Sequence, residues 1–450
     1  MNKLINKIIN QKSEITLDKT SIGSYEDILD IEEISINNLV KLFNESESII
    51  KLMTDNYLNY NNKLINLKNI SNITTKLLLI ELKNFPSFDS NNSSNNLSIY
   101  NEIKKVNIKK EYELSLNENI KFNIYFYYSR EDELFVNNQV SKLIKIIYVF
   151  CNSFGKKILN KINKFKIRFL IIDFPRKLDF SNYPDSNLTF DELSKYGIFN
   201  NSSGYTNKQT KEMVLSRKSG LNGLLIHELI HLLDLDFHFW DHDLPNVDKF
   251  NWKKEWTSKC NMLECTKEIK SNCGYYSFTE AICNTTSSYL LAIYSGIELY
   301  MNRINKVNSK EYDKIKKLAT MFYVIEYIHS YINSCKLLKY FGYDSYDSFF
   351  NNTSNRKYYQ DAHVFEYIIL RTFIISYYYQ IIFKKLKSYI DGKNQNSLEN
   401  YKFQKKINDF IFDKMIKKDI KPYFDYIFRI NKVDSNTYSI EYFATNFIKK

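Results

Sequence analysis

Glycine and proline are scarce in this sequence, which has only 10 and 5 of them among 450 residues. Because these residues make most tight turns, their scarcity argues against a turn-rich all-β fold and favours long helices. The sequence also lacks any apolar run of about 18 residues, so we expect no membrane span. Charged and polar residues interrupt residues 1–18, where a secretory signal peptide would be apolar. We therefore expect a protein that is not secreted through such a signal.

Cysteine is also sparse, and no two cysteines form a CxxC pair. The six cysteines are Cys151, Cys260, Cys265, Cys273, Cys283 and Cys335. We expect buried free thiols in a reducing, cytoplasmic compartment, with a disulfide or a second metal site as the alternative.

The excess of positive charge is moderate and is spread along the chain. The sequence has 63 basic and 51 acidic residues, a net charge of +12. Such a charge favours polyanionic partners, but the lysines are scattered among acids, without an arginine-rich arm or a recognisable nucleic-acid motif. We therefore expect a solvated basic surface and no specific nucleic-acid partner.

The stretch LLIHELIHLLD, at 224–234, contains the pattern His227-Glu228-x-x-His231. Residues four apart on an α-helix lie one turn above each other, so both imidazoles can bind one Zn²⁺ at about 2.0–2.1 Å. Glu228 would then face the open side of the metal and take a proton from its bound water. The rest of this helix is apolar almost all round, which predicts burial and makes three ionisable residues costly unless a cation binds them. The alternative is a chance match of a short motif.

A catalytic zinc needs a third protein ligand. The metzincin pattern fails here, because Phe237 stands at its third-ligand position and Asp234 at its glycine position. Glu280, at the start of a later helical run, is the preferred ligand, and Asn284 one turn on would hydrogen-bond a ligand histidine. Two alternatives stay open: Glu280 only complements its helix dipole, or Asp234 is the third ligand or an acceptor at the helix end.

The pattern of apolar residues predicts an α+β fold. We expect helices at 31–53, 62–85 and 141–154, strands at 121–129, 166–174 and 211–217, and further helices at 280–304, 313–341 and 364–386. This order predicts a small mixed sheet packed on the HExxH helix, with an edge strand that pairs with an extended peptide beside the metal. Residues 430–450 add a short strand or cover the core.

Three regions follow from this pattern. Residues 1–100 form a helical N-terminal region, 101–250 an α+β subdomain with the HExxH helix, and 251–450 a mainly helical subdomain that supplies the third ligand.

HELIH with Glu280 downstream resembles the zincin superfamily of zinc metallopeptidases, in its gluzincin branch. The longer pattern resembles zinc metalloproteinases encoded by large DNA viruses and, more loosely, lethal-factor-like gluzincins. It consists of NSSGYT at 201–206, a strand ending in Arg217, LLIHELIHLLDLDF and SFTEA, and it covers about residues 200–290.

This resemblance implies a zincin-like catalytic core in which His227, His231 and Glu280 bind one zinc ion per chain and Glu228 is the general base. It also implies that the protein is viral, and either cytoplasmic or virion-associated.

The sequence offers several candidates for the group that stabilises the oxyanion of the reaction. The resemblance implies Tyr276, or else Tyr275, although both lie closer to Glu280 than the tyrosine of lethal-factor-like enzymes does. Gluzincins also take such a group from their second subdomain, which makes His363 or Tyr367 a further candidate. A core or interface role for His363 is the alternative.

The remaining histidines are predicted to have other roles. His238 and His242 lie four apart among acids, where a solvated loop is favoured over a second ion. His329, on an aromatic helix, is assigned to packing.

The predicted activity is zinc-dependent hydrolysis of peptide bonds in a protein or peptide substrate. The alternative is a non-catalytic zinc-binding protein with a structural or host-interaction role. These two differ in one observable, since a structural zinc is closed by four protein ligands whereas a catalytic zinc keeps one position for water. A nucleic-acid-binding protein that uses the positive charge is a weaker third interpretation.

Overall fold

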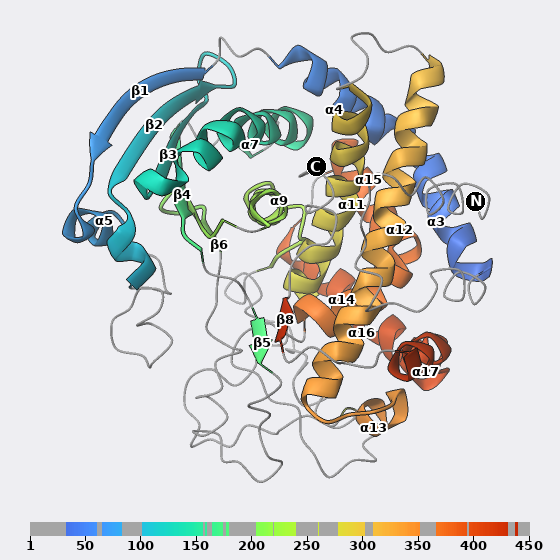
Figure 1. Cartoon of the computed structure of the whole chain (residues 1–450). Helices are drawn as coiled ribbons and strands as arrows, with labels where there is room; N and C mark the ends of the chain where they lie inside the picture. The colour runs from blue at the N-terminus through green and yellow to red at the C-terminus, as the bar shows by residue number, and fades with distance from the viewer. Residues whose placement is uncertain are drawn as a thin grey trace.

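The computed structural model describes residues 33–60, 65–82, 101–155, 158–159, 164–173, 177–179, 204–218, 220–239, 260, 278–301, 309–351, 366–393, 396–430 and 437–439. Within these ranges the protein is a mixed α+β structure, as the sequence predicts, with a six-stranded sheet beside a large helical half (Figure 1).

The sheet has the strand order β1-β2-β3-β4-β7-β6. Its strands are β1 (Ile65–Asn72), β2 (Ile108–Ser115), β3 (Lys121–Tyr128), β4 (Lys164–Ile171), β6 (Gly204–Asn207) and β7 (Glu212–Ser216). β4 is parallel to both of its neighbours, β3 and β7, whereas β1 pairs with β2, β2 with β3, and β6 with β7 in antiparallel register. A separate pair joins β5 (Lys177–Asp179) to β8 (Thr437–Ser439). The sheet is therefore mixed, with β1 and β6 at its two edges.

Alternation of side chains explains why the central strands form a two-faced sheet. Phe122, Ile124 and Phe126 of β3 point to one face and join the main core. Tyr127, the residue after Phe126, points to the other face, where a second apolar cluster includes Leu78. Both faces of the central strands are thus buried, which favours the aromatic and β-branched residues found there.

The helices fill the rest of the described structure. They are α3 (Glu33–Glu45), α4 (Glu47–Asn59), α5 (Thr75–Glu81), α7 (Glu133–Phe154), α9 (Leu221–Leu232), α11 (Phe278–Met301), α12 (Ser309–Tyr340), α13 (Tyr346–Phe350), α14 (Arg371–Ser376), α15 (Lys384–Ile390), α16 (Ser397–Ile416) and α17 (Lys421–Ile430), with a 3₁₀ turn η3 (Arg130–Asp132) and two π-helical turns, η7 (Glu366–Leu370) and η8 (Tyr379–Phe383).

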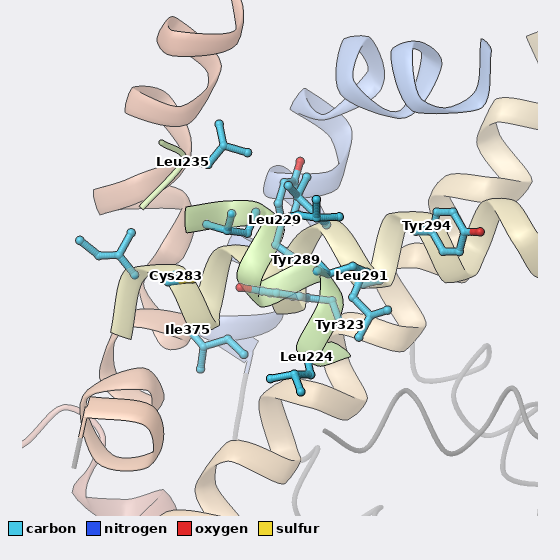
Figure 2. Packing of buried hydrophobic residues seen from close by; sticks show 14 of the residues in the cluster. Leu224, Leu229, Leu235, Cys283, Tyr289, Leu291, Tyr294, Tyr323 and Ile375 are labelled. Atoms are coloured by element: carbon cyan, nitrogen blue, oxygen red, sulfur yellow. The ribbon is translucent and has the colours of Figure 1, made fainter. Parts of the chain in front are cut away.

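Helix α9 lies between the sheet and the helical half (Figure 1). Figure 2 shows its leucines, among them Leu224 and Leu229, surrounded by buried side chains such as Tyr289 of α11 and Tyr323 of α12. Every residue of α9 except Asn222 and His231 is buried. A helix in this position has no solvent face, which explains why its sequence is apolar all round.

Two helical predictions for the N-terminal region had different outcomes. Within the predicted range 31–53, the described residues form α3 and the greater part of α4, and both helices join the same core as α11 and α12. The prediction of a helix over 62–85 was wrong, because Ile65–Asn72 form β1 and, of the described residues in that range, only Thr75–Glu81 form a helix. Pairing with β2 overrides the local pattern, since strand formation depends on a partner far along the chain.

Other boundaries differ in smaller ways. The predicted strands at 121–129, 166–174 and 211–217 are β3, β4 and β7, and the helix predicted at 141–154 already begins at Glu133. The single helix predicted over 364–386 is interrupted by η7 and η8. Of the two alternatives for residues 430–450, the structure shows the short strand, β8. The division into three regions stays a prediction.

In the described ranges, no helix combines the length and the apolar character that crossing a membrane requires.

Candidate metal centre

The two histidines of the HExxH pattern are presented by α9. The helix begins after Gly220, whose φ of 61° is a left-handed conformation that glycine adopts at little cost. Its spacing places His227 and His231 one turn apart, with their Nε2 atoms 3.2 Å from each other. Gly220 is the N-cap residue of this helix.

Glu280, in the first turn of α11, completes a triangle with these histidines. Its Oε2 lies 3.4 Å from His227 Nε2 and 3.4 Å from His231 Nε2. Ligand atoms of a tetrahedral metal with bonds of about 2.0–2.1 Å lie about 3.3–3.4 Å apart. The three atoms therefore have the spacing of one face of a metal coordination tetrahedron.

The electrostatics of Glu280 also fit a cation. Its Oε2 is buried and makes no hydrogen bond within the described part of the chain. Burial alone would raise the pKa of this carboxyl, but the imidazoles of His231 and His227 outweigh that effect and hold the pKa well below its usual range. The carboxylate is thus ionised, and its buried Oε2 faces two ring nitrogens, an arrangement that a metal ion would satisfy once the rings are deprotonated.

His231 is oriented by Asp236 on its other side. The Nδ1 atom lies 2.7 Å from Asp236 Oδ2, and Asp236 is 2% exposed. A proton on Nδ1 leaves the Nε2 lone pair of the neutral ring facing the triangle. Burial disfavours a charged His231, but Cys283, Glu280 and Asp236 outweigh burial and raise its pKa well above the ordinary value. Burial would likewise raise the pKa of Asp236, and His231 and Lys208 reverse that shift and lower it. Metal binding at this site would therefore displace a proton.

Glu228 is held on the sheet side of α9 by β6. Thr206 donates a hydrogen bond of 2.6 Å from its Oγ1 to Glu228 Oε2. Gly204 packs against the same carboxylate so closely that a β-carbon at 204 would collide with it. Burial raises the pKa of Glu228, and the two imidazoles and Thr206 only partly oppose that rise. A carboxyl with a raised pKa suits proton transfer near neutral pH.

Cys283 is a residue of this site that sequence analysis missed. Its Sγ donates to the carbonyl oxygen of His227 at 3.3 Å, and the thiol is fully buried. The potential ligand atoms of His227, His231 and Cys283 all lie within 4.8 Å of one another. The signal was present in the sequence, because Glu280-x-x-Cys283 places two ligand types on one face of a helix. The described chain thus holds a possible metal site, and the residues present fit a metal ion.

Two predicted contacts are replaced by others. Asp234 does not bond to a histidine but forms an ion pair with Lys208, so the acceptor at the helix end is Asp236. Asn284 does not bond to a ligand histidine either, since its Nδ2 donates to the carbonyl oxygen of Tyr367 at 2.9 Å. That bond places Tyr367 at the site, with its ring centroid 5.8 Å from the His227 ring.

The other candidates are divided between described and undescribed parts of the chain. Tyr275, Tyr276, His242 and His363 lie outside the described residues. His329 is half-buried in α12, where desolvation, Arg371 and Lys336 lower its pKa to about 3. A neutral imidazole agrees with the packing role expected for it.

Comparison with known proteins gives one informative match. The chain is 27% identical over 353 residues to an uncharacterized protein of Acanthamoeba polyphaga mimivirus, a match that covers 76% of this chain and 76% of the viral protein. No protein-family model matches the chain. No solved structure matches it significantly. The match supports a viral origin, and because the relative is uncharacterized it carries over no activity.

Proposed function

We propose that this protein is a zinc-dependent metallopeptidase. The single observation that carries the proposal is the triangle of His227 Nε2, His231 Nε2 and Glu280 Oε2, with sides of 3.2 to 3.4 Å. Two imidazoles and one carboxylate are the protein ligands of a class of catalytic zinc sites, and they leave a fourth position for water. The donor set suits zinc better than Mg²⁺ or Ca²⁺, which prefer oxygen ligands.

Each residue of the site has a task in this proposal. A bound zinc ion would lower the pKa of a coordinated water and polarise the carbonyl of the scissile bond. Glu228, fixed by Thr206, accepts the proton of the attacking water and passes it to the leaving amine. Asp236 keeps His231 in the tautomer that presents Nε2. Tyr367, whose ring lies beside that of His227, would donate a hydrogen bond to the oxyanion.

Strand β6 supports a peptide as the substrate. It pairs with β7 on one side and with no other described strand, so its outer edge offers backbone groups to an extended chain. The same strand touches Glu228 through Thr206 and Gly204. A peptide paired with this edge would lie beside the proposed base.

Metal analysis of purified variants tests the proposal. We expect about one zinc per chain in the wild type and in Glu228→Gln, and a loss of zinc in His227→Ala and Glu280→Ala, because only the last two remove a ligand. His329→Gln is the matched control, since it alters a half-buried helical histidine outside the site. Equal zinc contents in all five proteins would contradict the proposed metal centre.

Hydrolysis of a mixed library of quenched fluorescent peptides tests the chemistry. The wild type should cleave, and Glu228→Gln should lose about 10²- to 10⁴-fold in rate while keeping its zinc, as expected for a lost general base. Cleavage by Glu228→Gln at the wild-type rate would contradict the role of Glu228.

A non-catalytic zinc protein is the second candidate function. It is favoured by one observation, the thiol of Cys283 beside the histidines, because a fourth protein ligand would close the site. Full zinc occupancy with no cleavage of any peptide, in the wild type and in Cys283→Ser alike, would support this candidate over the first.

A further inference from the structure

We propose that Cys283 is an exchangeable fourth ligand, whose thiolate fills the metal position that water must occupy during hydrolysis. The inference rests on the proposed function, because it concerns the same metal. It adds a ligand that neither the HExxH pattern nor Glu280 implies. It also allows one site to exist both with four protein ligands and with a position open to water.

The position of Cys283 on α11 is the first argument. Glu280 and Cys283 are three residues apart, so they share the face of α11 that packs on α9. Cys283 Sγ lies 3.3 Å from the carbonyl oxygen of His227, which places the sulfur against the helix that carries both imidazoles. Figure 2 shows Cys283 on the helix that runs beside α9.

The distances are the second argument. The ligand atoms of Cys283, His227 and His231 lie within 4.8 Å of one another. In a tetrahedral site with a Zn–S bond of about 2.3 Å and a Zn–N bond of about 2.0–2.1 Å, sulfur and nitrogen are about 3.6 Å apart. A displacement of the thiol by about 1 Å, within the reach of a side-chain adjustment, therefore brings it to bonding distance.

The unsatisfied carboxylate oxygen is the third argument, and it is independent of the cysteine. Glu280 Oε2 is buried and makes no hydrogen bond to the described residues, yet it points at both imidazole nitrogens. The two nitrogens thus have an oxygen of Glu280 at 3.4 Å and the thiol of Cys283 within 4.8 Å. Four such ligands complete the coordination of Zn²⁺ without water.

The consequence is a metal site with two states. Cys283 would lose its proton to solvent on binding the metal, and the protein would then supply all four ligands. On release the thiolate would take a proton from solvent, and the thiol would again donate to the carbonyl oxygen of His227, as in the structure. A thiolate in the ligand set also favours zinc and cobalt over manganese or magnesium.

Cobalt(II) substitution tests the inference by a readout other than activity. We expect the cobalt-loaded wild type to show the near-ultraviolet charge-transfer band of a thiolate–cobalt bond. Cys283→Ser should bind cobalt without that band. Cys335→Ser, the matched control, should retain it, because Cys335 is also buried and donates to a backbone carbonyl, that of Phe424, away from the site.

The other possible outcomes contradict either ligation by Cys283 alone or the metal site as a whole. A wild type that binds one cobalt without the band, or a band that survives in Cys283→Ser, would refute ligation by Cys283 while leaving the metallopeptidase proposal intact. Failure of the wild type to bind cobalt or zinc at all would overturn both.

X-ray absorption of the zinc-loaded wild type needs no variant and so does not depend on the folding of a mutant. We expect a sulfur scatterer at about 2.3 Å beside nitrogen and oxygen at about 2.0–2.1 Å. A shell of nitrogen and oxygen alone would refute a resting state in which Cys283 binds the zinc.

Exchange of the thiolate for water is tested by the rate of peptide cleavage, which we expect to rise severalfold in Cys283→Ser, because water no longer competes with a thiolate. An unchanged or lower rate with full zinc would refute exchange.

Discussion

Helix α11 carries parts of two buried charged clusters that differ in one respect. Near its middle, Ser288 accepts a hydrogen bond of 2.9 Å from Arg371 Nη2, which also donates to Glu326 Oε2 at 2.6 Å. Arg371 is 4% exposed and Glu326 is 0% exposed. In its first turn, Glu280 faces two imidazoles whose nitrogens are both 3.4 Å away, and its Oε2 makes no hydrogen bond among the described residues.

The difference separates a structural ion pair, around Arg371, from a candidate metal site, around Glu280. A guanidinium and a carboxylate neutralise each other within the protein, so the cluster around Arg371 needs no further partner for its charge. The cluster around Glu280 presents nitrogen and oxygen lone pairs to one point, and its charge is balanced only by protons or by a cation. Buried charge alone therefore does not identify a functional site, and what distinguishes the cluster around Glu280 is that its carboxylate converges with two imidazole nitrogens.

The largest expected effect breaks the scaffold cluster. Arg371→Met should lower the free energy of unfolding by about 3–5 kcal/mol, because it leaves the Glu326 carboxylate buried without its counter-charge. Urea denaturation measures this loss. The double variant Arg371→Met with Glu326→Leu should recover most of it, and a single variant as stable as the wild type would contradict the comparison.

Metal binding should stabilise the other cluster. At a free zinc concentration about 100-fold above its dissociation constant, the free energy of unfolding should rise by about 2.7 kcal/mol. Thermal denaturation with zinc and with a chelator measures the difference. His231→Ala should show no such rise, and an equal rise in both proteins would place the zinc elsewhere.

Asp236→Ala should weaken metal binding without abolishing it. Loss of the carboxylate that orients a ligand histidine costs about 10- to 100-fold in metal affinity. Competition with a chromophoric chelator measures it. Asp234→Ala is the control, because its carboxylate pairs with Lys208 instead, and it should bind as tightly as the wild type. Weaker metal binding by Asp234→Ala than by Asp236→Ala would contradict the role given to Asp236.

The smallest effect is expected at the contact between β6 and α9. Thr206→Val removes the hydrogen bond to Glu228 and should lower the free energy of unfolding by roughly 1 kcal/mol. The zinc content should not change, since Thr206 touches none of the three proposed ligands. Denaturation and metal analysis of the same sample measure both, and a loss of zinc would show that Glu228 helps to hold the metal.

Local spacing predicted the part of the site that lies on one helix. The four-residue interval of His227 and His231 is enough to bring two imidazoles together, because an α-helix has a fixed pitch. The start of a later helix was also enough to single out Glu280. Strands β3, β4 and β7 could be predicted since they are rich in aromatic and β-branched residues.

Contacts beyond one element could not be predicted in the same way. Strand β6 has four residues and β1 is almost wholly exposed, so neither shows a clear alternation of apolar residues. At the end of α9, Asp234 adopts a φ of 55°, a left-handed turn that directs it to Lys208 and leaves Asp236 to meet His231. A spacing rule that assumes a continuous helix does not describe that turn.

The number of residues between Glu280 and Ser288 of α11 limits which insertions and deletions the protein can tolerate. One inserted or deleted residue between them would turn one end of the helix relative to the other by about 100°. Either Glu280 would then leave the imidazoles or Ser288 would leave Arg371. Sequences that descend from the same ancestor and keep both clusters should therefore align across 280–288 without a gap, and differences in length should accumulate in other parts of the chain.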